Sequence, residues 1–342
     1  MALIEYLNDR NVQVIAVVRG ESKRKRQIKE SKNIAIVECA LSEIIELPQR
    51  VKAMIKRKKW SEKQSIDAFY HFAWDGTFGD CRNDMYLQNQ NVKYALRAVD
   101  AAAELGCQTF VGAGSQAEYG RYEGKLNAKV PAFPENGYGV AKLCAGQMTR
   151  IKCRQKGIKH IWVRILSVYG PFDGSKTMVM SAIEKMLKGE RVSCTKGEQM
   201  WDYLYSKDAA KMMYLLGCQG INEKIYCLGN GTAKSLKEYI EVMRMIVNPD
   251  AEIGYGDIKY ADKQVMYLCA DIQEVFDDIG NISFYDFETG IQETIEWYKC
   301  HFMERDNKII HIPGGGKTPL YSVFIIKYAF FLMKNNKRRK CA

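Results

Sequence analysis

Five short apolar segments, separated by stretches with helical spacing, constrain the fold of this chain more than any other feature. They are rich in β-branched and aromatic residues, as buried strands are, and lie at 12–18, 33–38, 68–74, 108–114 and 160–166. One intervening stretch, 89–106, repeats apolar residues at helical spacing and ends on Gly106, a residue typical of helix C-termini. Repeated strand–helix–strand units predict a doubly wound parallel sheet with helices on both faces, in the α/β class.

The pattern changes after about residue 170, and this change predicts three parts of the chain. Residues 1–170 are expected to form the doubly wound domain. Residues 171–300 are expected to form a smaller α/β lobe over the carboxyl edge of the sheet, where such folds bind ligands, with some elements returning to the sheet. Residues 301–342 form a basic and apolar tail. Helices are expected in the lobe at 177–188, 206–217, 235–247 and 288–300.

The charge of the chain is concentrated in that tail. The net charge is +11, and the tail alone contributes +7, with nine Lys and Arg residues against two acidic ones. The body therefore carries only +4, which gives no support to nucleic-acid binding. Eleven cysteines without a CxxC pair and four dispersed histidines predict no metal site.

The apolar part of the tail is a candidate segment for spanning or binding a membrane. Residues 320–333 are mostly apolar, but fourteen residues are too few to span a bilayer as a helix. A helix with a basic end at 320–340 could bind weakly to a membrane surface, or it could pack on the body or extend from it. The N-terminus has no signal-peptide pattern, so the cytoplasm is the expected location.

The strongest chemical signal is a serine, a tyrosine and a lysine. Ser115 follows the apolar segment 108–114, so it is expected at the carboxyl end of a strand. In "YGVAK" (138–142), Tyr138 and Lys142 lie one turn apart if the segment starts a helix. A nearby ammonium group favours the phenolate and lowers the pKa of the phenol. Such a tyrosine can exchange a proton with an alcohol, which fits hydride transfer between a secondary alcohol and a nicotinamide cofactor.

With these residues, the chain resembles the extended short-chain dehydrogenase/reductase superfamily, and within it the NAD-dependent epimerase/dehydratase family that modifies nucleotide sugars. The resemblance covers about residues 3–300 and also rests on "FYHFAW", "NQNVKYALRAVDAAAELG", "GSQAEYG", "RILSVYGP" and "GEQMWDYLYSKDAA". It implies a Rossmann-like fold, an NAD(P) cofactor and a nucleotide-sugar substrate, and it leaves a homodimer open.

The resemblance also implies the residues of the site. Ser115, Tyr138 and Lys142 would be the catalytic triad, and Asn91 would support the lysine. The expected cofactor-binding residues are Arg19, Ser22, Lys23, Ala73, Trp74, Asn91, Tyr138, Lys142 and Leu166. The expected substrate-binding residues are Asp75, Gln116, Ser167, Thr177, Gln199 and Trp201. A purely structural role stays open for each substrate residue.

The largest departure from the family is at the start. The family opens with a strand and a GxxGxxG turn that holds the cofactor pyrophosphate. Here residue 1 already lies in the helix expected after those glycines. About twenty residues would then be lacking, judged by the size of a strand and its turn. Truncation of an active enzyme is therefore the expectation, with an uncovered apolar strip where the central strand would lie.

Further departures concern the cofactor and the reaction. Arg19 stands where relatives that prefer NAD usually have an acidic residue, and with Ser22 and Lys23 it favours the 2′-phosphate of NADP. Gln116 and Ala117 stand where the 4,6-dehydratases carry an acidic pair, which disfavours dehydration. Epimerisation or reduction of a keto-sugar, in the synthesis of surface polysaccharides or nucleotide sugars, is the expected activity.

Two points stay open at this stage. Trp201 stands where many relatives use an arginine for the pyrophosphate, so Lys196, Lys259 or Lys263 would have to supply that charge. The alternative to an enzyme is a non-catalytic protein, either a remnant that does not bind cofactor or a regulatory binding module of the same family.

Overall fold

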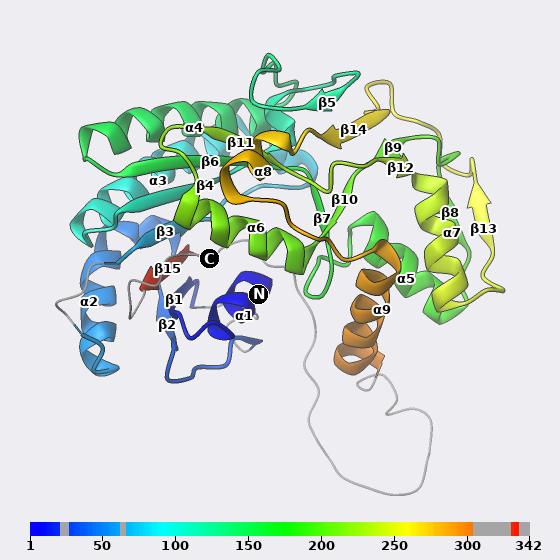
Figure 1. Cartoon of the computed structure of the whole chain (residues 1–342). Helices are drawn as coiled ribbons and strands as arrows, with labels where there is room; N and C mark the ends of the chain where they lie inside the picture. Colours follow the sequence, from blue (N-terminus) through cyan, green and yellow to red (C-terminus); the bar gives the residue numbers. More distant parts are fainter. Residues whose placement is uncertain (21–26, 62–65, 304–329, 335–342) are drawn as a thin grey trace, which may run out of the picture.

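The computed structural model describes residues 1–20, 27–61, 66–303 and 330–334. Its central sheet has seven strands in the order β11-β6-β4-β3-β15-β1-β2 (Figure 1). These strands are β1 (Gln13–Val18), β2 (Ile34–Glu38), β3 (Ala68–His71), β4 (Thr109–Ser115), β6 (Lys159–Ile165), β11 (Ile225–Leu228) and β15 (Phe330–Lys334). All pairs among them are parallel except those of β15, which is antiparallel to both β1 and β3.

The helices cover both faces of this sheet and build the second lobe. They are α1 (Ala2–Asn8), α2 (Leu47–Arg57), α3 (Met85–Glu104), α4 (Gly137–Gln155), α5 (Met178–Lys188), α6 (Ser206–Gln219), α7 (Leu236–Val247), α8 (Gln273–Ile279) and α9 (Phe287–Tyr298). Short helical turns are η2 (Leu41–Glu46), η3 (Gly79–Asn83), η4 (Gln116–Glu118) and the π-helix η5 (Lys299–Met303). The predicted helices of the lobe are confirmed within a few residues.

Short strands outside the main sheet connect the lobe to it. They are β5 (Lys125–Leu126), β7 (Ser167–Tyr169), β8 (Val192–Cys194), β9 (Met200–Trp201), β10 (Tyr203–Tyr205), β12 (Lys234–Ser235), β13 (Ile253–Tyr255) and β14 (Tyr267–Ala270). They form three small sheets. β11 pairs with β6 in the main sheet, although it follows the first lobe segments in the chain.

The side chains of each strand point alternately to the two faces of the sheet. Both faces are buried, which explains why the five segments are apolar throughout instead of alternating between apolar and polar residues. In β1, Val14 and Ala16 face one core, whereas Ile15 and Val17 face the other. In β3, Tyr70 faces α1 and α6, and Phe69 faces the side of α2 and α3. Because helices cover both faces, both sets of side chains are buried, as in parallel sheets generally. The predicted strand at 68–74 ends earlier, at His71.

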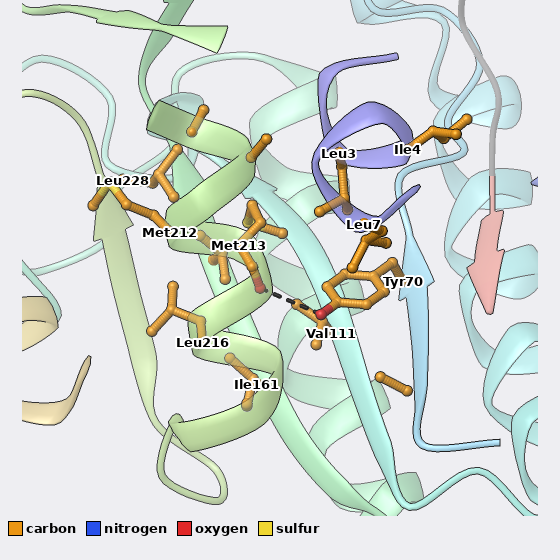
Figure 2. Packing of buried hydrophobic residues seen from close by; sticks show 14 of the residues in the cluster. Leu3, Ile4, Leu7, Tyr70, Val111, Ile161, Met212, Met213, Leu216 and Leu228 are labelled. Carbon is orange, nitrogen blue, oxygen red and sulfur yellow. Dashed lines mark hydrogen bonds between the residues drawn. The ribbon is translucent and has the colours of Figure 1, made fainter. Parts of the chain in front are cut away.

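One face of the sheet is closed by α1 and α6, which Figure 2 shows against β3 and its neighbours. Leu3 and Leu7 of α1 meet Met213 and the other apolar residues of α6 in one buried cluster. Tyr70 donates a hydrogen bond from its hydroxyl to the Met213 carbonyl at 3.4 Å (Figure 2). Gly217 permits this approach, since a Cβ there would lie 2.0 Å from the tyrosine oxygen.

The tail differs from its prediction. Residues 330–334 are a strand in the middle of the sheet, so the expected helix is wrong there. The expectation of an uncovered strip beside β1 is also wrong, because β15 pairs with both β1 and β3. The rest of the predicted membrane-binding segment, 320–329 and 335–340, lies outside the described residues. In the described part of the chain, no helix has the length and apolar character that crossing a membrane requires.

Candidate active site

The start of α4 positions the tyrosine and the lysine as predicted. Asn136 caps the helix, and its side-chain oxygen accepts a hydrogen bond from the Gly139 amide at 2.9 Å. Tyr138 and Lys142 therefore lie one turn apart on the face that meets the sheet. Gly139 is required at this point, because a Cβ there would lie 2.2 Å from the Ala117 carbonyl oxygen. The helix thus packs directly on the turn that follows Ser115.

Ser115 ends β4, as predicted, and its hydroxyl caps the turn η4 by accepting a hydrogen bond from the Ala117 amide at 3.2 Å. Its own amide donates to Glu118 at 2.8 Å. Glu118 is fully buried and also accepts bonds from Trp162 and Arg164. The glutamate therefore faces this buried cluster and not the large cavity, and it positions the serine backbone.

Lys142 is buried, with 4% of its surface exposed, and its ammonium group has two contacts that orient it. Nζ donates to the Ala113 carbonyl at 2.7 Å and lies 3.9 Å from the ring centroid of Trp74. It lies 5.8 Å from the ring centroid of Tyr138. Burial lowers the pKa of Lys142 to about 7, so its charge changes near neutral pH.

Tyr138 differs from the expectation of a lowered pKa. Burial raises the pKa of its phenol above the ordinary value, while the Ser115 hydroxyl and the Arg82 guanidinium lower it. The Trp74 ring meets the tyrosine ring edge-on, at 6.2 Å between centroids. Desolvation outweighs the neighbouring charges here because the ring is enclosed between α4, Trp74 and η3. The phenol is thus favoured in its protonated form in the absence of ligands.

Asn91 supports the site through the loop after β3. Its side chain accepts a hydrogen bond from the Asp75 amide and donates one to the Asp75 carbonyl, both at 2.9 Å. Gln88, one turn earlier on α3, accepts a bond from the Trp74 indole at 2.9 Å. The two amides of α3 therefore fix the loop that carries Trp74 under the lysine. The implied support of Lys142 by Asn91 stays a prediction, and in this structure it would run through that loop.

These residues meet at one cavity of about 530 Å³ along the carboxyl edge of the sheet. Ser115, Tyr138 and Lys142 line it together with Trp74 and Leu166. Its other walls come from α1, the end of β1 at Val18, the loop at 170–173 and the start of α6. Ala73 is buried beside Trp74. The tertiary structure therefore brings the predicted catalytic residues and several predicted cofactor residues to one place.

The shape and donors of this cavity fit a nicotinamide cofactor at one end. Lys142 and Tyr138 present an ammonium and a hydroxyl group there, and Trp74 and Leu166 provide an apolar floor. The far end, between α1 and Val18, is apolar. The described residues supply no glycine-rich turn from a strand into a helix at this edge. The fit therefore rests on the residues around the nicotinamide ribose.

The predicted contacts of the adenine ribose lie at the far end. Arg19 follows β1 directly and is exposed beside that end of the cavity. Ser22 and Lys23 fall outside the described residues. Their roles in selecting a 2′-phosphate stay predictions.

The predicted substrate residues fall into separate groups. Ser167 and Trp201 bond each other, with the indole donating to the serine hydroxyl at 2.7 Å. Thr177 caps α5 and donates to Asp173 at 2.9 Å, and Gln199 is buried and accepts a bond from Thr195. These four have structural contacts that do not require a ligand. Gln116 lines a second, smaller cavity beside the first, of about 190 Å³, and Asp75 lies in the loop fixed by Asn91.

Sequence reasoning missed one residue that contacts Tyr138 and two that line the large cavity. Arg82 of η3 stacks on the Tyr138 ring, with its guanidinium carbon 4.7 Å from the centroid. Thr77 and Asp173 line the large cavity. Arg82 comes 56 positions before Tyr138 in the chain, in a polar loop without a motif, so its position next to the phenol follows from the packing of η3 on α4.

The chain is similar to curated proteins at low identity. A Bacillus subtilis protein named uncharacterized UDP-glucose epimerase YtcB is 24% identical over 198 residues, which cover 57% of this chain and 63% of that protein. The chain therefore spans less than two thirds of this relative's length.

Solved structures share the fold at lower identity. The UDP-glucose 4-epimerase of Thermotoga maritima, solved with UDP-glucose, is 20% identical with a TM-score of 0.74, over 87% of this chain and 94% of that one. The Bordetella bronchiseptica enzyme WbmG, solved with NAD, is 14% identical with a TM-score of 0.72, over 88% and 90% of the two chains. Residues 1–229 match the family described as the NAD dependent epimerase/dehydratase family. This chain is a member of that family.

Proposed function

We propose that the protein is an NAD(P)-dependent nucleotide-sugar epimerase or keto-reductase in which Tyr138 exchanges a proton with a sugar hydroxyl. The observation that carries the proposal is the convergence of Ser115, Tyr138 and Lys142 on the large cavity at the carboxyl edge of the sheet. The Thermotoga neighbour was solved with UDP-glucose, which makes a UDP-sugar the first substrate to test. WbmG was solved with NAD, and Arg19 supports a preference for NADP in this chain.

Each residue of the site has its own role in the reaction at the sugar oxygen. Ser115 offers its hydroxyl to the oxygen that loses or gains the proton, and the Tyr138 phenol exchanges that proton. Lys142, with a pKa of about 7, supplies a positive charge below that pH and a proton reservoir near it. A bound nicotinamide would supply the acceptor and donor of hydride at the carbinol carbon. The buried walls at Trp74 and Leu166 exclude water from the keto form of the sugar.

Gln116 and Ala117 bear on the reaction type. Neither side chain can remove a proton from carbon, and the nearby Glu118 is held in the buried cluster with Arg164. This supports epimerisation or keto-reduction over dehydration. A cytoplasmic location, a homodimer and a role in nucleotide-sugar or surface-polysaccharide synthesis are also part of the proposal. The resemblance to the family supports the last two.

The test is conversion of nucleotide sugars by the full chain, with NAD or NADPH added. An epimerase converts UDP-glucose or a related sugar without net cofactor use, whereas a reductase consumes NADPH in step with product. Tyr138→Phe should lower the rate by about 10²- to 10⁴-fold while the affinity for the sugar nucleotide stays within about twofold, because only proton transfer is removed.

Two outcomes would contradict the proposal. One is a folded wild-type chain that binds neither cofactor, measured by fluorescence titration. The other is a Tyr138→Phe variant that keeps the wild-type rate of sugar conversion. The first outcome would favour a non-catalytic protein.

A further inference from the structure

The second cavity beside Tyr138 has a residue that the proposed reaction does not yet use. Arg82 is half-buried, its guanidinium carbon lies 4.7 Å from the Tyr138 ring centroid, and its Nη1 donates to the Thr77 carbonyl at 3.5 Å. The guanidinium has five N–H donors. The ring face and one carbonyl account for only part of them. Arg82 therefore has donors available next to the catalytic phenol.

Hydrogen bonds hold η3, the turn that carries Arg82, to α4 on one side and to α3 on the other. The side chain of Asn83 accepts a hydrogen bond from the Gly137 amide at 3.0 Å, which joins η3 to the first turn of α4. Asp84 caps α3 by accepting from the Leu87 amide, and Gln88 donates to the Cys81 carbonyl at 2.8 Å. A close contact between Met85 and Gly137, where a Cβ would lie 2.8 Å from the Met85 sulfur, tightens the same junction. The guanidinium is thus held in place relative to Tyr138.

Arg82 also lines the cavity of about 190 Å³, together with Gln116, Glu135, Asn136 and Lys263. This cavity adjoins the large one, because Gln116 follows Ser115 directly and Arg82 stacks on Tyr138. A group that binds there is next to the sugar atoms on which Ser115 and Tyr138 act.

The charges around this cavity favour an anion. Glu135 is the acidic residue of the lining, and Arg121 binds both of its carboxylate oxygens, at 3.1 and 3.0 Å from Nε. Arg82 and Lys263 then remain as two positive charges, and neither forms an ion pair with another described residue. A planar guanidinium beside an ammonium is the arrangement that binds carboxylates and phosphates.

We propose that the cavity lined by Arg82, Gln116 and Lys263 receives a carboxylate carried by the hexose of the substrate, rather than a phosphate of the nucleotide. Arg82 binds this group next to Tyr138, and Lys263 contributes charge from the opposite loop. The inference rests on the proposed function and adds the substrate class, which is a sugar nucleotide whose acidic group binds in this cavity. The inference explains why Arg82 contacts Tyr138, although proton transfer by Tyr138 does not require an arginine.

The test uses isothermal titration of the full chain with UDP, UDP-glucose and UDP-glucuronate, which separate the two sources of the anion. If the hexose carboxylate binds here, wild-type protein prefers UDP-glucuronate over UDP-glucose by about tenfold or more, and Arg82→Gln removes that preference while UDP-glucose affinity stays unchanged. If Arg82→Gln instead weakens all three ligands by a similar factor, the group bound here is a phosphate that they share, and the carboxylate site is wrong. Arg82→Lys should restore part of the lost affinity, because it keeps the charge.

Controls separate this inference from the proposed function. Lys129→Gln removes an exposed charge that does not line the cavity and should leave all three affinities unchanged. Circular dichroism and the melting temperature establish that Arg82→Gln is folded. If wild-type protein binds these ligands and folded Arg82→Gln binds them equally well, the anion site is wrong and the proposed function stands. If wild-type protein binds none of them and converts no nucleotide sugar, the proposed function itself fails.

Discussion

Trp162 lies between β4 and α4, and three glycines give its indole the room it occupies. A Cβ at Gly112, Gly114 or Gly146 would lie between 2.3 and 2.7 Å from atoms of that ring. The indole nitrogen donates to Glu118 at 3.0 Å, so the ring joins the helix of Tyr138 to the turn of Ser115. The small residues of "VGAGS" therefore serve this packing, which sets how closely α4 approaches the strand.

Gly146→Ala tests that packing. Alanine is favoured over glycine inside a helix by about 1 kcal/mol. If there were free space for a methyl group at Gly146, the substitution would therefore stabilise the protein. We expect instead a net loss of about 1 to 2 kcal/mol in the free energy of unfolding, because the new methyl group overlaps Trp162. Urea unfolding measures it, with Cys144→Ala on the exposed face of the same helix as the control. A more stable Gly146→Ala protein would show that helix and sheet are not in this contact.

Glu118 and Arg164 form a buried ion pair, 2.7 Å apart, with 0% and 3% of their side chains exposed. Glu118→Gln leaves the guanidinium buried without its counter-charge, so we expect a loss of about 3 to 5 kcal/mol in the free energy of unfolding. Arg164→Met in the same protein should recover part of the loss. Glu104→Gln, which breaks an exposed pair with Lys52, should have a far smaller effect. Equal losses for Glu118→Gln and Glu104→Gln would contradict a buried pair.

At the scale of the elements, β15 completes the sheet in an unusual way. It runs antiparallel between two strands that belong to a parallel sheet, with Leu332 paired to Ile15 on one side and Phe69 on the other. This is also the position where the strand connections change direction, since β1 leads to β2 on one side and β3 leads to β4 on the other. Doubly wound folds bind ligands over that position. Residues 330–334 are therefore part of the sheet beneath the cavity.

A proline in β15 tests its place in the sheet. Proline has no N–H group to donate and is not tolerated in interior strands. We expect Leu332→Pro to lower the free energy of unfolding by about 2 kcal/mol or more, because a buried carbonyl of β1 or β3 loses its partner. Leu332→Val, which keeps the N–H, should have a small effect. Hydrogen exchange at β1 and β3 should accelerate in the proline variant, and equal exchange in both variants would place β15 outside the sheet.

At the scale of the whole molecule, two buried histidines make stability depend on pH. Burial lowers the pKa of His160 to about 4 and that of His71 to about 3. His160 stacks between Phe110 and Trp162 and bonds Thr149 at 3.0 Å. Arg150 lowers its pKa further, whereas Glu223 raises it. Between pH 6.5 and 4 the unfolded chain binds a proton at this residue that the folded protein does not, so the folded state loses stability as the pH falls through this range.

His160→Phe measures this contribution. Phenylalanine keeps the stacking but cannot be protonated. Wild-type protein should lose about 3 kcal/mol more than the variant on acidification from pH 7 to pH 4, the free energy of a shift from 6.5 to about 4. Urea unfolding at the two pH values gives the difference. Parallel curves for the two proteins would mean that His160 is accessible to protons in the folded state.

Much of the fold and the site could be predicted from the sequence because the signals are local. Strands buried on both faces are continuous apolar runs, so the cores of β1, β2, β4 and β6 stand out. Tyr138 and Lys142 needed only the helical repeat to be placed together. β11 was not predicted, since four apolar residues carry too little pattern, and β15 was read as a helix because its apolar run fits either structure.

The sequence by itself determined the parallel sheet, the helix that pairs Tyr138 with Lys142, and Ser115 at a strand end, because each depends on a short-range repeat. Only the tertiary structure decided that Arg82 stacks on Tyr138, that Glu118 is bound to Arg164, and that β15 lies between β1 and β3. Those contacts join segments distant in the chain. They depend on how surfaces pack and which charges are desolvated, and no local pattern encodes that.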